Sequence, residues 1–159
     1  MSLTVRAATR DDAAGMVAVL RPIIEAKIYS SMTGEITLAS QQAYLETALP
    51  HGMFFVALDP AGNLVGLQNI DRTEDEGRGE IATFVDLDQR GTGIGHALAK
   101  KTLPDARLRD LREVTASIRS SNGGAIGFYR SIGFEDHGWR SSWAVHGRDE
   151  EIVRLTLRL

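Results

Sequence analysis

The N-terminal part of the chain carries one strand pattern followed by two helical patterns. Residues 3–7 alternate apolar and polar side chains, as a half-buried strand does. Over residues 13–20 the apolar side chains recur at helical spacing, and Thr9 begins a capping-box pattern ahead of them. Pro22 is expected to kink or restart this helix. A second helix is predicted over 37–49, directly before a proline.

The middle of the chain changes from helical spacing to strand patterns. Two runs rich in β-branched and aromatic residues, 53–59 and 64–71, flank a turn sequence at Asp59 to Asn63. A third run of this kind covers 80–86 and follows a charged turn. Because the connections are short, the three runs predict an antiparallel meander.

The C-terminal half alternates helical and strand patterns. Helical spacing extends over 91–103, and Pro104 is expected to break or kink the helix before a second helical piece that reaches Leu111. Four shorter elements follow: a strand over 113–118, a helix over 122–132, and strands over 134–145 and 152–157. The order β-α-α-β-β-β-α-β-α-β-β predicts the α/β class, with a mixed sheet and helices on both faces. With 159 residues the chain has the usual length of one domain, so we expect a single domain over 1–159.

Composition and charge exclude several classes of protein. The 18 Lys and Arg residues against 21 Asp and Glu leave a net charge of −3, so no global positive field attracts nucleic acid. Without cysteine, the chain has no disulfide, thiolate ligand or cysteine nucleophile. Its four histidines lack paired spacing, so we expect no metal site. No apolar run approaches the roughly 18 residues that span a bilayer, which predicts a cytoplasmic protein without a membrane partner.

Three closely spaced glycines, Gly91, Gly93 and Gly95, lie between a predicted strand and a predicted helix. The first turn of a helix has unpaired N–H groups and a positive dipole end, and glycines let an anion approach the backbone. Arg90 adds a positive charge beside them. The G-x-G-x-G spacing matches neither the dinucleotide fingerprint nor the P-loop. By itself the cluster is equally compatible with a phosphate site and with a plain tight turn.

A second cluster follows about 30 residues later, as Asn122-Gly-Gly-Ala-Ile-Gly-Phe-Tyr129-Arg-Ser-Ile-Gly-Phe134. Together the two clusters resemble the GNAT superfamily of N-acetyltransferases. Arg90-Gly91-Thr92-Gly93-Ile94-Gly95 is similar to its Q/R-x-x-G-x-G/A loop, and the second cluster to its N-x-x-A-x-x-x-Y-x-x-x-G-F helix. Within the superfamily, Glu80 five residues before Val85 and His146-Gly147-Arg148 before the final strand resemble the pattern of phosphinothricin-type acetyltransferases. Pro104 and Asp110 depart from the family pattern, which usually has an uninterrupted helix and a terminal glycine there.

The resemblance implies an enzyme that transfers an acetyl group from acetyl-CoA, its co-substrate, to a primary amine by direct attack in a ternary complex. It also implies a mostly antiparallel sheet with a splayed central strand pair, opened by a bulge in the strand before the glycine loop. Main-chain groups of that strand would pair with the pantetheine arm and stabilise the oxyanion. The cofactor-binding residues implied are Phe84, Val85, Arg90, Gly91, Thr92, Gly93, Ile94, Gly95 and Asn122.

Two side chains are the candidates for acid and base catalysis. Glu80 shares a strand face with Phe84 and is the predicted base that takes a proton from the amine, with a solvated carboxylate as the alternative. Tyr129 falls on the family's tyrosine position and is the predicted acid for the CoA thiolate, with a core tyrosine as the alternative. For Asn122, helix N-capping is the alternative to cofactor contact.

The acceptor is expected to be a small-molecule amine, such as the amino group of an amino acid or an amino-acid-like compound. Its pocket is expected over 29–49 and 134–145, with Tyr29, Met32, Trp139 and Trp143 as candidate lining residues. The turn before Glu80 is acidic and is a candidate for attracting a cationic acceptor, with a solvated turn as the alternative; its carboxylates are Asp71, Glu74, Asp75 and Glu76. An N-terminal or peptide acetyltransferase and a non-catalytic CoA-binding module are the alternatives. A nucleotide-binding module that uses the G-x-G-x-G loop is a further alternative. The strand-rich tail and the resemblance are compatible with a homodimer, and the oligomeric state stays open.

Overall fold

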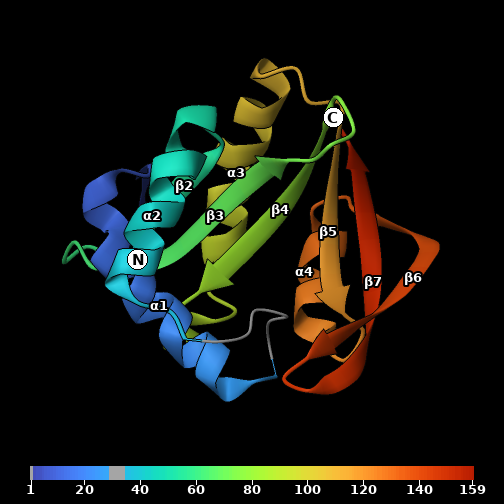
Figure 1. Ribbon diagram of the computed structural model, residues 1–159. Helices are drawn as coiled ribbons and strands as arrows, with labels where there is room; N and C mark the ends of the chain where they lie inside the picture. The colour runs from blue at the N-terminus through green and yellow to red at the C-terminus, as the bar shows by residue number, and fades with distance from the viewer. Residues whose placement is uncertain (1, 29–34) are drawn as a thin grey trace.

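Seven strands form one sheet in the computed structural model of the protein, and helices cover both of its faces (Figure 1). The structure describes residues 2–28 and 35–159. The strands lie in the order β1-β2-β3-β4-β5-β7-β6, and β4 and β5 are parallel while the other neighbours are antiparallel. Their bounds are β1 (Thr4–Ala7), β2 (Phe54–Leu58), β3 (Leu64–Arg72), β4 (Arg78–Val85), β5 (Glu113–Arg119), β6 (Glu135–Val145) and β7 (Arg148–Arg158). The predicted α/β class and mixed sheet are confirmed.

Two pairs of helices enclose the sheet, one pair on each face (Figure 1). The helices are α1 (Ala13–Ala26), α2 (Leu38–Ala48), α3 (Ile94–Leu108) and α4 (Gly123–Ser131). On one face, Met16 of α1 and Leu45 of α2 pack with Leu67 of β3. On the other face, Leu98 of α3 packs with Val65, and Tyr129 of α4 packs in the cluster around Ile81. None of the helices in the described ranges is long and apolar enough to cross a membrane.

Neither proline interrupts its helix, because α1 runs through Pro22 and α3 runs through Pro104, so the restart expected at Pro22 and the break expected at Pro104 are wrong, and a kink at either stays a prediction. A proline inside a helix leaves the carbonyl four residues earlier without its N–H partner. Those carbonyls belong to Ala18 and Lys100, which are both exposed, so water can satisfy them. After the end of α3, Asp110 adopts φ 67°, a left-handed conformation that glycine adopts most readily and that the glycine usual at this position of the family pattern would permit.

The central strands β4 and β5 diverge. They pair only at the start, where Arg78–Glu80 lie against Glu113–Thr115. Beyond that point each strand follows its other neighbour: β4 keeps an unbroken register with β3 up to Gly66 and Val85, and β5 pairs along its whole length with β7. The predicted splayed pair is confirmed. The predicted bulge is wrong, because over these residues the β3–β4 register shows no shift.

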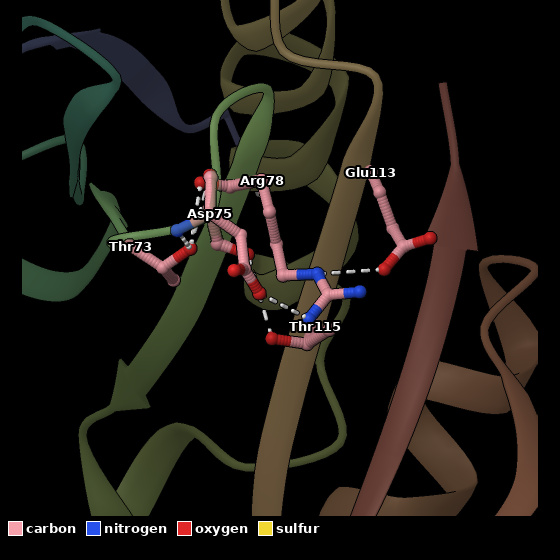
Figure 2. A network of polar contacts seen from close by, with 6 residues as sticks. Thr73, Asp75, Arg78, Glu113 and Thr115 are labelled. Carbon is pink, nitrogen blue, oxygen red and sulfur yellow. Dashed lines mark hydrogen bonds and ion pairs between the residues drawn. The ribbon is translucent and has the colours of Figure 1, made fainter.

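An arginine fastens the closed end of the diverging pair (Figure 2). Arg78 Nε donates to Glu113 Oε1 at 2.8 Å, and Arg78 Nη1 donates to Asp75 Oδ2 at 2.8 Å. The main-chain N–H of Arg112 donates to the carbonyl of Gly77 at 2.7 Å. The turn between β3 and β4 is thereby tied to the beginning of β5, so the two strands separate only beyond this point.

Candidate active site

A cleft of about 1750 Å³ opens where β4 and β5 separate. Its walls come from the glycine loop and α4 on one face of the sheet, and from α1 and α2 on the other. The predicted site residues that line it are Glu80, Phe84, Val85, Arg90, Gly91, Gly93, Ile94, Gly95, Asn122 and Tyr129. Thr92 is the exception, since its hydroxyl turns back to donate to the carbonyl of Gln89 at 2.6 Å.

Strand alternation divides β4 between the two halves of the cleft. Phe84 lies opposite Leu67 in the ladder and packs against the α1 cluster, so Glu80 and Ala82 face the same side. Thr83 faces the other side, where the Tyr129 hydroxyl lies 2.8 Å from its Oγ1. Glu80 and Tyr129 therefore lie on opposite faces of the sheet, with the opening between the strands separating them.

The glycine loop forms an open cradle at the start of α3. Gly91 and Gly93 have φ of 76° and 88°, and Gly93 is the N-cap of the helix. A Cβ at either position would meet no atom within 4 Å, so the space above the loop is free. The first N–H groups of α3 face this space with the positive end of the helix dipole. The residues present therefore fit a pyrophosphate group.

The loop meets the second motif across the cleft. A Cβ on Gly95 would lie 2.8 Å from Phe128 Cε1, so α3 and α4 touch at this glycine. Arg90 Nη2 would lie 3.8 Å from a Cβ on Gly124, which places the guanidinium beside the first turn of α4. Asn122 caps α4, because its Oδ1 accepts from the N–H of Ala125 at 3.1 Å. The capping alternative for Asn122 is confirmed, and its contact with a cofactor stays a prediction.

Main-chain groups of β4 line the opening between the strands. Asp86 N–H donates to the Val65 carbonyl at 2.9 Å, so even-numbered residues of β4 direct their N–H groups toward β3. By alternation, Thr83 and Val85 direct theirs away from β3 and into the opening. The Phe84 side chain contributes to the apolar wall of the other half of the cleft. The Thr83 N–H donates to the Tyr129 hydroxyl, so the Val85 N–H is the main-chain donor that this part of the strand directs at a bound group.

Tyr129 is a buried phenol with a fixed hydrogen bond. It is 5% exposed, and its hydroxyl donates to Thr83 Oγ1, which also accepts from Gln68 Nε2 at 2.9 Å. Burial raises the pKa of the Tyr129 phenol to about 12, and the charge of Glu80 adds to this, while hydrogen bonds from Thr83 oppose it. Tyr129 is therefore protonated at neutral pH, as an acid must be.

Glu80 lies half-buried on the other side of the opening. In the β3–β4 ladder it is directly opposite Asp71, on the same face. Both carboxylates line the cleft, and within the described residues the carboxylate of Glu80 makes neither a hydrogen bond nor an ion pair. A carboxylate in this position can accept a proton or bind an ammonium group.

Two polar side chains beside Glu80, Tyr44 and Asn69, were not predicted from the sequence, whereas Asp71 belongs to the acidic turn named there as a candidate for attracting a cationic acceptor. The hydroxyl of Tyr44 in α2 donates to Asp71 Oδ2 at 2.9 Å and accepts from Asn69 Nδ2 at 2.7 Å. Burial and the Asp71 charge raise the pKa of Tyr44 above its usual range, so the phenol stays a donor to Asp71. Asn69 and Asp71 follow Leu67 on β3 at intervals of two residues, so all three share one face of the strand. This spacing was the signal available in the sequence.

The remaining candidates are distributed unevenly. Trp143 lines the cleft, whereas Trp139 lies under the Arg154 guanidinium, 3.9 Å from the ring centre. Ser117 and Arg119 of β5, not predicted, also line the cleft. Tyr29 and Met32 lie outside the described residues. Within the described ranges no three His, Asp or Glu side chains are grouped to hold a metal ion.

Comparison with known proteins agrees with this geometry. The model of the Acetyltransferase (GNAT) family matches residues 25–134. The L-methionine sulfoximine/L-methionine sulfone acetyltransferase of Pseudomonas aeruginosa is 32% identical over 143 residues, which cover 87% of this chain and 83% of that relative.

Solved structures share the fold. A phosphinothricin acetyltransferase from Sinorhizobium meliloti in complex with acetyl-CoA superposes with a TM-score of 0.89 at 21% identity, covering all of this chain and 89% of that one. A ribosomal-protein-alanine N-acetyltransferase from Brucella melitensis gives 0.88 at 23% identity, covering 98% and 99%. The matched family model spans most of the cleft residues. The chain therefore belongs to the GNAT family of acetyltransferases, whose enzyme class is acetyl-CoA-dependent N-acetylation.

Proposed function

We propose that the protein transfers the acetyl group of acetyl-CoA to the primary amine of a small, amino-acid-like molecule, by direct attack within a ternary complex. One observation carries the proposal: an unpaired carboxylate, Glu80, and a protonated phenol, Tyr129, flank the same opening in the sheet from opposite faces. This places a base on the side of α1 and α2 and an acid on the side of the glycine loop. The two reactants can then meet in the opening.

The residues of the cleft have distinct tasks in this reaction. Acetyl-CoA supplies the acyl group as a thioester. The amides and N-terminus of α3 at Gly93 to Gly95 hold its pyrophosphate, with Arg90 beside them. Glu80 accepts the proton that the attacking amine loses. The Val85 N–H points into the opening, where negative charge develops on the carbonyl oxygen. Tyr129 donates a proton to the departing sulfur.

The acceptor class is inferred from the cleft and from the relatives. Asp71 and Glu80 provide two carboxylates for an ammonium group on the α2 side. The adjacent wall is apolar, formed by α1 residues that include Leu20, Ile23 and Ile24. The relative from Pseudomonas aeruginosa is named for two amino-acid derivatives, which supports an acceptor of that kind. The cytoplasmic location expected from the sequence stays a prediction, and the oligomeric state, for which the sequence is compatible with a homodimer, stays open.

The test is release of free thiol from acetyl-CoA by the purified protein. The acceptor panel contains amino acids, methionine sulfoximine, methionine sulfone, polyamines and short peptides. The chain has no cysteine, so it adds no background thiol. Turnover with an amino-acid derivative is the expected result, and mass spectrometry must show the acetylated amine. Turnover with peptides alone would instead indicate an N-terminal acetyltransferase. Binding of acetyl-CoA without turnover on any acceptor would favour a non-catalytic CoA-binding module.

A further inference from the structure

The hydroxyl of Thr83 connects Tyr129 to a buried glutamine on the neighbouring strand. Thr83 and Gln68 are direct partners in the β3–β4 ladder, and Gln68 is completely buried. Thr83 Oγ1 receives two hydrogen bonds, one from Gln68 Nε2 at 2.9 Å and one from the Tyr129 hydroxyl at 2.8 Å. Thr83 and Tyr129 both line the cleft, and Gln68 lies behind them.

The Thr83 hydroxyl has a proton that neither of its two hydrogen-bonding neighbours accepts. An amide NH2 group can only donate, whereas a hydroxyl carries one proton and two lone pairs. Because both neighbours of Thr83 donate to its oxygen, its own proton is not used by either of them. Within the described residues the Thr83 hydroxyl donates to no other group. The Thr83 hydroxyl is therefore available as a hydrogen-bond donor, and its oxygen lies 2.8 Å from the Tyr129 oxygen.

The orientation of the Gln68 amide keeps this donor available. Gln68 Oε1 is buried and has no hydrogen-bond partner in the described chain. A buried carbonyl without a partner is costly, so such a group calls for a reason. With the amide reversed, Oε1 would accept the Thr83 proton and occupy it. The orientation present directs the NH2 group at Thr83 and leaves the Thr83 proton free for Tyr129.

We propose that Thr83 and Gln68 are positioning residues for the acid step, supplying the hydrogen bond that the Tyr129 oxygen needs when it gives up its proton. As the C–S bond of the tetrahedral intermediate breaks, its electron pair passes to sulfur, and Tyr129 donates its proton to that sulfur. The Thr83 hydroxyl then turns to donate to the phenolate, while Gln68 Nε2 continues to donate to Thr83. The phenolate regains a proton from solvent water after the thiol leaves. This inference rests on the proposed function.

The acid step has a specific need for such support. Burial makes Tyr129 a weak acid, because it disfavours the phenolate. A thiolate is a much weaker base than a buried phenolate, so proton transfer from Tyr129 to sulfur is uphill unless the phenolate is stabilised. A hydrogen bond to a charged group is stronger than one to a neutral group. The Thr83 hydroxyl can therefore assist the transition state more than the ground state.

Thr83→Val is the principal test, and Thr83→Ser is its matched control. Valine removes the hydroxyl at similar size, and serine keeps it. We expect Thr83→Val to lower kcat by about tenfold or more, because it removes a hydrogen bond to a charged group. The KM for the amine and the Kd for acetyl-CoA should stay within about twofold, since neither ground-state contact changes. Thr83→Ser should retain kcat within about threefold.

A double-mutant cycle separates positioning from a general structural effect. In a Tyr129→Phe background, Thr83→Val should cause no further loss of kcat, because the group it supports is absent. Gln68→Met should lower kcat by a smaller factor than Thr83→Val and should also lose its effect in that background. Thermal unfolding of each variant reports whether it is folded.

Four results would overturn the inference. Full kcat in Thr83→Val beside an impaired Tyr129→Phe would remove the role of Thr83 and leave the acid assignment standing. An equal loss in the wild-type and Tyr129→Phe backgrounds would show that Thr83 acts independently of Tyr129. Full kcat in Tyr129→Phe would remove the acid step and this inference together, while acetyl transfer itself remained established. Lack of transfer by the wild-type protein would remove the proposed function and the inference with it.

Discussion

Glu80 and Asp71 face each other directly across the β3–β4 ladder, on the side of the sheet that α2 covers. Side chains at such paired positions lie close together, and like charges there repel unless a cation joins them. Asp71 is held by the Tyr44 hydroxyl, and within the described residues neither carboxylate has an ion-pair partner. The pair therefore favours an ammonium group, which is the form in which an amine arrives at neutral pH.

Glu80→Gln should lower kcat by about 100-fold or more, because a general base contributes roughly that factor. The Kd for acetyl-CoA should not change, since Glu80 lies on the acceptor side. Steady-state kinetics and calorimetric titration measure the two quantities. Glu74→Gln is a suitable control, because Glu74 is exposed in the turn before β4 and does not line the cleft. Unchanged turnover in Glu80→Gln would remove Glu80 as the base.

Asp71→Asn should raise the KM for the amine by about tenfold, the effect of losing one charge-assisted contact to an ammonium group. The kcat should change much less, because Asp71 binds the amine before and during the reaction alike. Tyr44→Phe should produce a smaller increase in KM, since Asp71 keeps its charge but loses the bond of 2.9 Å that orients it. A lower kcat at unchanged KM would contradict this assignment.

Much of the fold and half of the site could be predicted from the sequence, because those parts depend on local patterns. Strand alternation placed Glu80 on one face with Phe84, and the structure has this arrangement. The element order was also predicted correctly. Both the face on which a strand residue lies and the type of each element depend on residues that are close together in the sequence. The glycine loop likewise leads into a helix as predicted, although α3 begins at Ile94 and the helical spacing had predicted a start at Gly91.

The parts that were missed depend on contacts between distant segments. The bond between Tyr44 and Asp71 requires α2 to pack across β3, and the Gln68–Thr83–Tyr129 chain requires the register of two strands and the position of α4. The prediction of a bulge in β4 was wrong for a similar reason. The opening between β4 and β5 arises because β5 pairs with β7, and no local pattern in β4 encodes that.

Gly93→Ala should weaken acetyl-CoA binding, and Gly62→Ala is its matched control. Both glycines have φ of 88°, and a Cβ on either would meet no atom within 4 Å. The strain of an alanine at positive φ is therefore the same, and each variant should lose about 1 kcal/mol of unfolding free energy. Only Gly93 lies at the anion cradle, so only its variant should raise the Kd. Equal Kd values for acetyl-CoA in the two variants would show that the glycine loop does not contribute to acetyl-CoA binding.

Arg78→Met should destabilise the closed end of the diverging strands. The ion pair with Glu113 is partly buried, with side chains 36% and 28% exposed, so its loss should cost about 1 kcal/mol. Arg78 also pairs with Asp75 in the turn between β3 and β4, so the substitution removes both contacts that join this turn to the start of β5 through the arginine. The opening should therefore become less rigid, and acetyl-CoA should bind more weakly. Arg10→Met is the control, since its pair with Glu46 is 72% and 54% exposed. Urea denaturation measures both effects, and a double-mutant cycle of Arg78 with Glu113 isolates the pair.

Asp12 should make stability depend on pH in the acid range. Its carboxylate is 7% exposed and accepts two hydrogen bonds from Arg6, at 2.8 Å each, and one from the Thr9 N–H. Burial alone would raise the pKa of Asp12, but these hydrogen bonds from Arg6 and Thr9 outweigh it and hold the pKa below its usual 3.8. The folded state thus releases this proton more readily than the unfolded state does.

The sign of the pH effect follows from this difference. Above the unfolded pKa near 4 both states are ionised, and the full stabilisation by Asp12 is present. As the pH falls through that value the unfolded chain binds a proton first, so the free energy of unfolding decreases until the folded carboxylate also titrates. Asp12→Asn should lower stability at pH 7 and flatten the acid decline, as urea denaturation between pH 7 and 2.5 would show. Asp11→Asn, at an exposed neighbour, should leave the decline unchanged; an equally steep decline in Asp12→Asn would assign it to other carboxylates.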